Sequence, residues 1–169
     1  MVELDKVLEL MVRQKAGLFD FKELYAFMWR WLESEGYDTD EKEYTEKIKP
    51  GGKEVFIEWR ARRRISDYFR FYLKVLYAVI GMTEVEVSRN GTKFRLNRGE
   101  IRVDIIAYLE KDYESRWETS PTAKFLRGVY DRYIIRGRVL QYELKVRDEA
   151  LNLSEQVKAF LALEARRFA

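Results

Sequence analysis

The sequence contains neither cysteine nor histidine. The lack of cysteine excludes a disulfide framework and a thiol nucleophile. The lack of both residue types excludes zinc sites of the usual Cys/His kind, serine–histidine triads and cysteine–histidine dyads. Neither a phosphate-binding loop nor a GxGxxG or GxSxG motif is present. We therefore expect a binding protein rather than an enzyme, with no catalytic residues, no cofactor and no metal.

Long apolar segments and targeting signals are also missing. The longest uncharged run, Val75–Thr83, is far shorter than the about 20 residues that cross a bilayer. The acidic N-terminus is unlike a signal peptide, which predicts a soluble, cytoplasmic protein. The 169 residues suit a single domain, residues 1–169, and abundant Glu, Lys and Arg without cysteine are typical of thermophile proteins.

Charge is dense and unevenly distributed along the chain. Residues 1–50 carry 8 Lys and Arg against 12 Asp and Glu, whereas residues 51–116 carry 14 against 10 and residues 117–169 carry 10 against 7. The net charge of +3 is therefore concentrated after residue 50.

The clearest pattern is an alternation of apolar and charged residues between residues 53 and 80. Apolar side chains occupy odd positions on both sides of Ser66-Asp67, and charged side chains occupy the even positions of the first half. A three-residue loop, Ser66-Asp67-Tyr68, keeps the apolar face continuous across a hairpin. It predicts the inner pairs Ile57/Tyr77, Trp59/Val75 and Ala61/Leu73, and the outer pairs Arg60/Lys74, Arg62/Tyr72 and Arg64/Arg70.

Turn residues extend this hairpin into a meander. Asn90-Gly91 is a strong two-residue hairpin signal and pairs Val87 with Phe94. Asn97-Arg98-Gly99 predicts another turn before a last strand. Pro50-Gly51-Gly52 predicts that a polar strand, about 43–49, pairs with residues 55–61 so that Ile48 faces Val55 and Tyr44 faces Trp59. The prediction is an antiparallel meander of five to six strands over residues 43–112 with one apolar face.

Helices are predicted on both sides of the meander. The spacing of apolar residues predicts a helix over 3–16, and an Asp20/Glu23 capping box begins a second one, so that residues 1–36 form a helical hairpin. The second helix is apolar almost all round, which indicates burial on two sides or contact with an apolar ligand or a partner chain, including a homodimer. Ser120-Pro121 begins a long helix to about 148, in which Gly128 and Gly137 are expected to allow close packing, and a break near Asn152 precedes a last helix. The C-terminal helices cover residues 120–168.

The fold class that follows is α+β. The long helix is expected to lie across the apolar face of the sheet, an arrangement similar to the helix-grip architecture, although that architecture usually begins with a strand. The runs Glu110–Glu114, Trp117–Pro121 and Lys124–Tyr133, with Ile65–Phe69, resemble small uncharacterised archaeal proteins of unassigned function. This resemblance implies no activity.

Two candidate sites follow from these patterns. The first is the outer face of the hairpin, where basic and tyrosine side chains alternate as in surfaces that bind single-stranded nucleic acid or an acidic protein: Arg60, Arg62, Arg64, Tyr68, Arg70, Tyr72 and Lys74. The ordinary alternative is a solvated strand face. The second is a pocket for an apolar small molecule between sheet and long helix, formed by Trp59, Phe71, Tyr77, Phe94, Tyr130 and Tyr133. A tightly packed core is its alternative.

Overall fold

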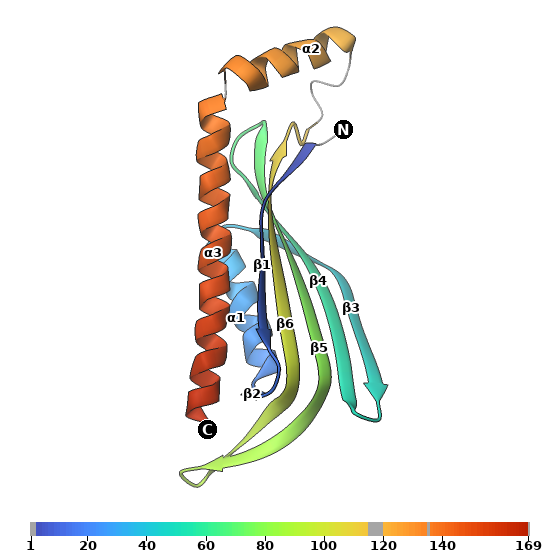
Figure 1. Ribbon diagram of the computed structural model, residues 1–169, viewed down its shortest axis with the longest axis vertical. Coiled ribbons are helices and arrows are strands. Elements are labelled where there is room, and N and C mark those ends of the chain that lie inside the picture. Colours follow the sequence, from blue (N-terminus) through green and yellow to red (C-terminus); the bar gives the residue numbers. More distant parts are fainter. Residues whose placement is uncertain (1–2, 115–119, 135, 169) are drawn as a thin grey trace.

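The computed structural model describes residues 3–114, 120–134 and 136–168. Its sheet is antiparallel and consists of β1 (Glu3–Gln14), β2 (Leu18–Phe19), β3 (Asp38–Lys49), β4 (Gly52–Arg64), β5 (Phe69–Arg89) and β6 (Thr92–Lys111). The helices are α1 (Phe21–Ser34), α2 (Pro121–Val129), one π-helical turn, η1 (Tyr130–Ile134), and α3 (Arg136–Arg167). The strand order is β1-β6-β5-β4-β3, with β2 beside β6, so the sheet is open and β1 and β3 form its edges (Figure 1).

Helices α1 and α3 cover one face of the sheet, and α2 crosses its end (Figure 1). Helix α3 packs against β1 and β6, and the buried side chains of its inner face join those of the sheet in one apolar cluster. The predicted fold class, an α+β protein in which helices and a long C-terminal helix pack against an antiparallel sheet, is confirmed. Within the described residues no helix is long and apolar enough to cross a membrane.

The helix predicted over residues 3–16 is wrong, because this segment forms β1. Leu8 and Val12 lie opposite Ala107 and Val103 of β6, and the pairing shifts register between Lys6 and Leu8. The shift is an irregularity of the β-bulge kind, which changes the phase of the alternation and places two apolar residues side by side. The resulting spacing imitates a helical pattern. The helical hairpin over 1–36 is therefore a strand followed by a helix, and the fold begins with the strand that helix-grip architectures usually have.

The registers of the two central hairpins are confirmed at every predicted pair. Trp59 lies opposite Val75 on the inner face, and Arg60 lies opposite Lys74 on the outer face. Asn90 and Gly91 form the β5–β6 turn with φ angles of 50° and 78°, the left-handed conformation that two-residue hairpin turns require. Strand alternation and turn chemistry thus agree, and they determine which side chains face the helices.

Two other details of the meander differ from the prediction. Asn97-Arg98-Gly99 is not a turn, because β6 continues through it and pairs with the single strand β5. A Cβ atom at Gly99 would lie 3.0 Å from the carbonyl oxygen of Ile80, so this glycine allows a close approach of two strands. In β3, Tyr44 faces Ile57 rather than Trp59, and Ile48 faces Lys53 rather than Val55, because Lys49 pairs directly with Gly52 in a tighter turn.

Helix α1 confirms the interpretation that it is buried on two sides. Asp20 caps it by accepting a hydrogen bond from the Glu23 backbone N–H, as predicted. Its Trp29 ring meets Trp59 of the sheet with centroids 5.1 Å apart, and its Phe27 ring stacks on Phe160 of α3 at 5.4 Å. The apolar circumference is therefore explained by a position between sheet and α3.

The C-terminal helices begin at Ser120-Pro121 as predicted, but the break is misplaced. The chain changes direction at η1, whereas α3 runs without interruption through Asn152, because Ala150 and Leu153 are both buried on the sheet side. The close packing expected at Gly128 and Gly137 is also wrong, since a Cβ atom at either would have no neighbour within 4 Å.

Candidate anion-binding face

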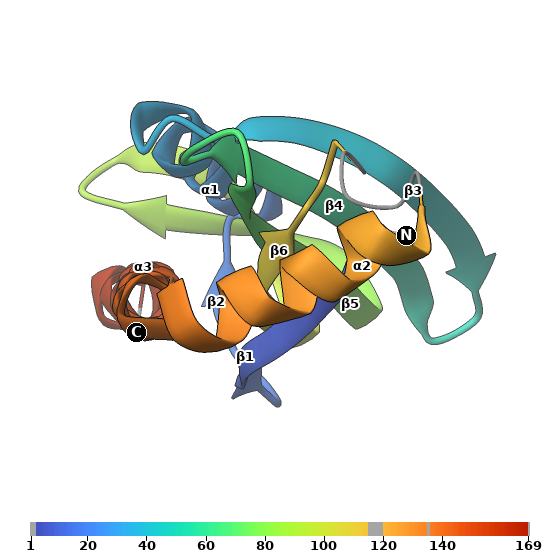
Figure 2. The ribbon, with the colours of Figure 1, turned by 90° about the horizontal axis from the view of Figure 1, so that it is seen from above.

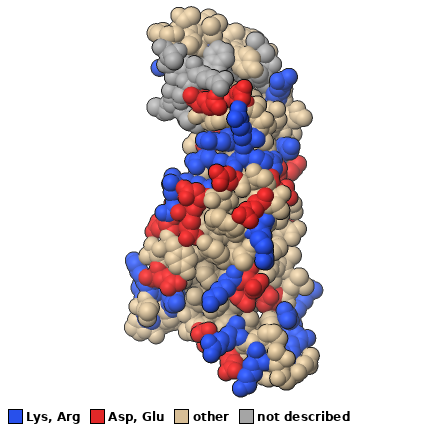
Figure 3. Space-filling view, turned by 180° about the vertical axis from the view of Figure 1, so that it is seen from behind, with Lys and Arg blue, Asp and Glu red and all other residues tan. Residues whose placement is uncertain are grey.

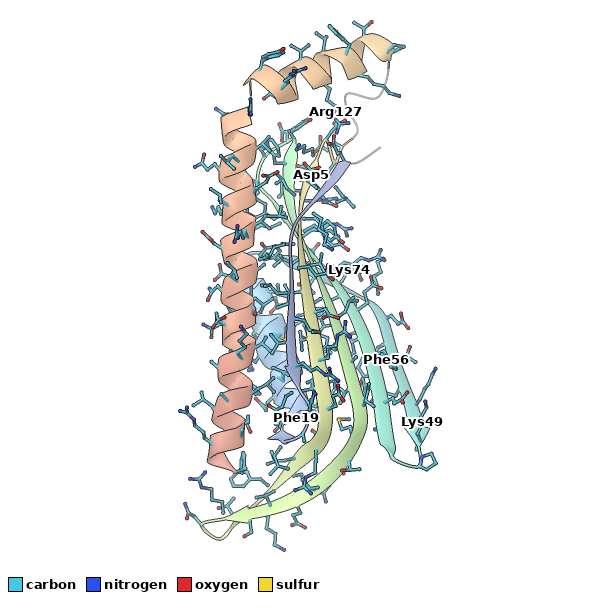
Figure 4. All side chains as sticks on the ribbon, viewed as in Figure 1. Asp5, Phe19, Lys49, Phe56, Lys74 and Arg127 are labelled. Atoms are coloured by element: carbon cyan, nitrogen blue, oxygen red, sulfur yellow. The ribbon has the colours of Figure 1, made fainter. Side chains whose placement is uncertain are left out.

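The outer face of the β4–β5 hairpin points away from the helices. Figure 4 shows Lys74 on the side of the sheet opposite α3. The predicted cross-strand pairs bring three arginines of β4 next to Arg70 and Lys74 of β5. Seen from behind, Lys and Arg form a band across the upper part of the molecule with Asp and Glu beside it (Figure 3). Basic side chains on this molecule are thus accompanied by acids.

Glu58 relieves the repulsion between the first pair of like charges. Its carboxylate lies 3.2 Å from Nε of Arg60 and 3.4 Å from Nζ of Lys74. Partial burial alone would raise the pKa of Glu58, but the Arg60 hydrogen bond and the two positive charges outweigh it and lower that pKa. One carboxylate therefore holds two opposing cations in place.

Glu110 does the same for the arginines nearer the loop, and it is buried. Its side chain is only 3% exposed, and it accepts hydrogen bonds from Nε of Arg70 and, at 3.4 Å, from Nε of Arg62. A buried carboxylate is stable only with such charged, hydrogen-bonded partners. Both guanidinium groups bind Glu110 through Nε, and among the described residues no hydrogen bond joins their terminal nitrogens to another group, which leaves these nitrogens as donors for an external anion.

The tyrosines of this face support the arginines. The Arg62 guanidinium lies 4.5 Å from the ring centroid of Tyr72, and Tyr72 stacks on Tyr108 at 5.1 Å. Burial raises the pKa of the Tyr72 phenol, although Arg60 and Arg62 oppose this effect. The Tyr68 ring packs on Phe69 and Tyr130. The Tyr72 ring is only 6% exposed and so does not present the open face that base stacking requires.

A hollow of about 620 Å³ lies where these arginines meet the edge strand β3. It is lined by Arg60, Arg62, Arg64 and Arg70 together with Asp38, Thr39 and Asp40. Arg64 is the most exposed of the four arginines and pairs with Asp67 in the hairpin loop. The structure therefore brings four of the seven predicted side chains to one hollow. Tyr72 and Lys74 lie opposite Arg62 and Arg60 on the same face, whereas Tyr68 packs against Tyr130 and Arg127 at the end of the sheet.

The six rings of the predicted apolar pocket do not gather in one place. Trp59 and Tyr77 contact each other in the core with centroids 4.9 Å apart, and Phe71 is fully buried near Tyr142. The other three lie at the ends of the molecule: Phe94 against Phe168, Tyr130 against Tyr68, and Tyr133 largely exposed. These positions are those of core and surface rings.

Two contributions to the face were missed at the level of sequence. Glu110 is not among the residues that the sequence pattern assigned to this face, but it lies buried opposite Arg70. The Asn90-Gly91 turn alone would not have revealed it, because the β5–β6 register shifts between Ile80 and Thr83. Asp38 and Asp40 precede the strand expected at 43–49, and β3 begins earlier, so that Asp38 and Asp40 pair with Arg62 and Arg60.

Comparisons with known proteins add little. No protein-family model matches the chain, and a search of curated proteins finds no match. The chain is similar to an uncharacterised protein of known structure from Rhizobium leguminosarum at 12% identity, over 97% of this chain and 99% of that chain, with a TM-score of 0.23. A score this low supports no argument about fold or function. The resemblance to archaeal proteins stays a prediction.

Proposed function

We propose that this protein is a non-enzymatic binding protein that holds an anionic macromolecule on the outer face of the β4–β5 hairpin. The partner that fits this face best is a nucleic acid strand. The observation that carries the proposal is the arrangement at Glu110, where one buried carboxylate orients Arg62 and Arg70 at the rim of a hollow that Arg60 and Arg64 also line. Guanidinium groups oriented in this way suit the paired oxygens of phosphate groups.

The proposed contacts are to phosphates rather than bases. Tyr72 is buried under Arg62 and Tyr68 is packed against Tyr130, so the rings expected to stack on bases serve the protein instead. Contacts to phosphate fix the position of a strand but do not select its sequence. We therefore expect binding that tolerates different base sequences and weakens steeply as salt rises. We also propose that the protein is cytoplasmic and that it comes from a thermophile.

The proposal is tested by fluorescence anisotropy with a labelled single-stranded oligonucleotide at low salt. The test variant is Arg60→Gln/Arg64→Gln/Lys74→Gln, which removes three cations of the face and keeps both partners of Glu110. The matched control is Lys47→Gln/Lys49→Gln/Lys53→Gln, which removes the same charge around the far β3–β4 turn. We expect the test variant to bind at least about tenfold more weakly and the control to bind like the wild type.

Two results would contradict this proposal. Equal weakening in both variants would mean attraction by net charge alone. The second result is that the wild type does not bind the oligonucleotide but binds an acidic polypeptide, and that the test variant does not bind this polypeptide. The face would then recognise a protein partner instead of a nucleic acid.

A further inference from the structure

Helix α2 and the turn η1 form a crossbar at one end of the molecule. Seen from above, α2 lies over the ends of the strands (Figure 2). Its inner side is anchored by Arg127, which donates hydrogen bonds to Glu3 at 2.6 Å and to the Tyr68 hydroxyl at 3.2 Å (Figure 4). The Tyr130 ring adds an edge contact with Tyr68 at 5.9 Å. One side of the crossbar is thus fixed to the sheet.

The rest of the crossbar exposes large apolar side chains. Phe125 is 70% exposed, Leu126 50% and Tyr133 72%, and no residue of α2 is buried. At 100° per residue Phe125 and Leu126 fall within about a third of the circumference of α2, and Phe125 lies nearly opposite Arg127. Scattered single apolar residues on a surface need no explanation, but three exposed ones within one short segment do.

Basic residues accompany this apolar side. From Ser120 to Tyr142 the sequence holds five basic residues, Lys124, Arg127, Arg132, Arg136 and Arg138, and one acidic residue, Asp131. Lys124, Arg132, Arg136 and Arg138 are exposed. A helix with apolar side chains on one side and Lys and Arg beside them is typical of segments that lie in the interface of an anionic membrane.

We propose that α2 and η1 dock on the surface of an anionic lipid bilayer, with Phe125, Leu126 and Tyr133 inserted at the level of the headgroups. A second copy of the chain fits this surface poorly, because its own excess of basic residues would face the same charge. A peptide partner fits poorly as well, since α2 lies at one end of the molecule (Figure 1) and these side chains are largely exposed on it and on η1. Exposed apolar side chains with basic residues beside them suit a planar anionic surface.

The first test is co-sedimentation of the full chain with lipid vesicles. Vesicles of phosphatidylcholine with phosphatidylserine should bind the protein, and vesicles of phosphatidylcholine alone should bind it at least about tenfold less. Leu126→Glu should weaken binding to the anionic vesicles by about tenfold or more. The matched control, Leu163→Glu, replaces an exposed leucine (65%) near the far end of α3 and should bind like the wild type.

A second test locates the contact. Because the chain has no cysteine, a single cysteine placed at Phe125 or at Leu163 can carry an environment-sensitive dye without background labelling. The dye at position 125 should shift to the blue with anionic vesicles, and the dye at position 163 should not. No binding to anionic vesicles, equal weakening by Leu126→Glu and Leu163→Glu, or a shift at position 163 alone would overturn the proposal. The Arg60→Gln/Arg64→Gln/Lys74→Gln variant should retain vesicle binding, which separates this surface from the hairpin face.

Discussion

The two faces of the β4–β5 hairpin share one backbone but differ in almost every other respect. On the inner face Trp59 and Leu73 are fully buried against helix and sheet side chains. On the outer face Arg60 and Lys74, their immediate neighbours in the chain, reach solvent and share one carboxylate. Alternate residues of each strand thus contribute to stability on the inner face and to the proposed recognition on the outer face. Substitutions on the two faces should therefore affect different measurements.

The largest effect is expected on the inner face. Trp59→Ala removes a buried ring that meets Tyr25, Trp29 and Tyr77 edge to face. The free energy of unfolding, measured by urea denaturation, should fall by about 3–5 kcal/mol. Affinity for the oligonucleotide, measured per folded molecule, should stay the same. A loss of affinity without a loss of stability would show that the two faces are not separate.

A smaller effect is expected at Glu110, which differs from the arginines of the outer face because it is buried. Glu110→Gln leaves Arg62 and Arg70 without their common carboxylate and should lower the free energy of unfolding by about 1–3 kcal/mol. It should also weaken oligonucleotide binding despite making the face more positive, because the two guanidinium groups lose their orientation.

The control for Glu110→Gln is Glu86→Gln, which breaks an exposed pair with Lys93 and should change stability by less than about 0.5 kcal/mol. Tighter binding in Glu110→Gln would mean that net charge, rather than orientation, governs recognition.

The smallest effect is expected on the inner side, at Tyr25 of α1. Burial, with the hydrogen bond to Glu41, raises the pKa of Tyr25 to about 12. A raised pKa favours the protonated phenol in the folded state, so its contribution to stability is complete below about pH 10 and is lost as the pH rises through about 12. Tyr25→Phe should therefore flatten the loss of stability between these values, measured by urea denaturation at each pH. A wild-type decline in Tyr25→Phe would contradict the assignment.

The sequence predicted local pairing better than long-range pairing. The β4–β5 and β5–β6 registers follow from alternation and from the Ser66–Tyr68 and Asn90-Gly91 turns, which are short-range signals. Strand β1 was missed because its register shift imitates helical spacing and because its partner, β6, is distant in sequence, with Glu3 opposite Lys111 and Gln14 opposite Ile101. The arginines of the candidate site could be predicted for the same reason as the hairpin. The role of Glu110 could not, since it depends on the register of a third strand.

The most direct measurement is the salt dependence of oligonucleotide binding. The slope of log K against log salt reports how many phosphates the protein neutralises. We predict that Arg60→Gln/Arg64→Gln/Lys74→Gln makes this slope shallower by about 2. Three phosphate contacts are lost, and each contributes about 0.7 to the slope with a single strand. The control at Lys47, Lys49 and Lys53 should keep the wild-type slope. Equal slopes in both variants, or a wild-type affinity that does not change with salt, would contradict recognition at the hairpin face.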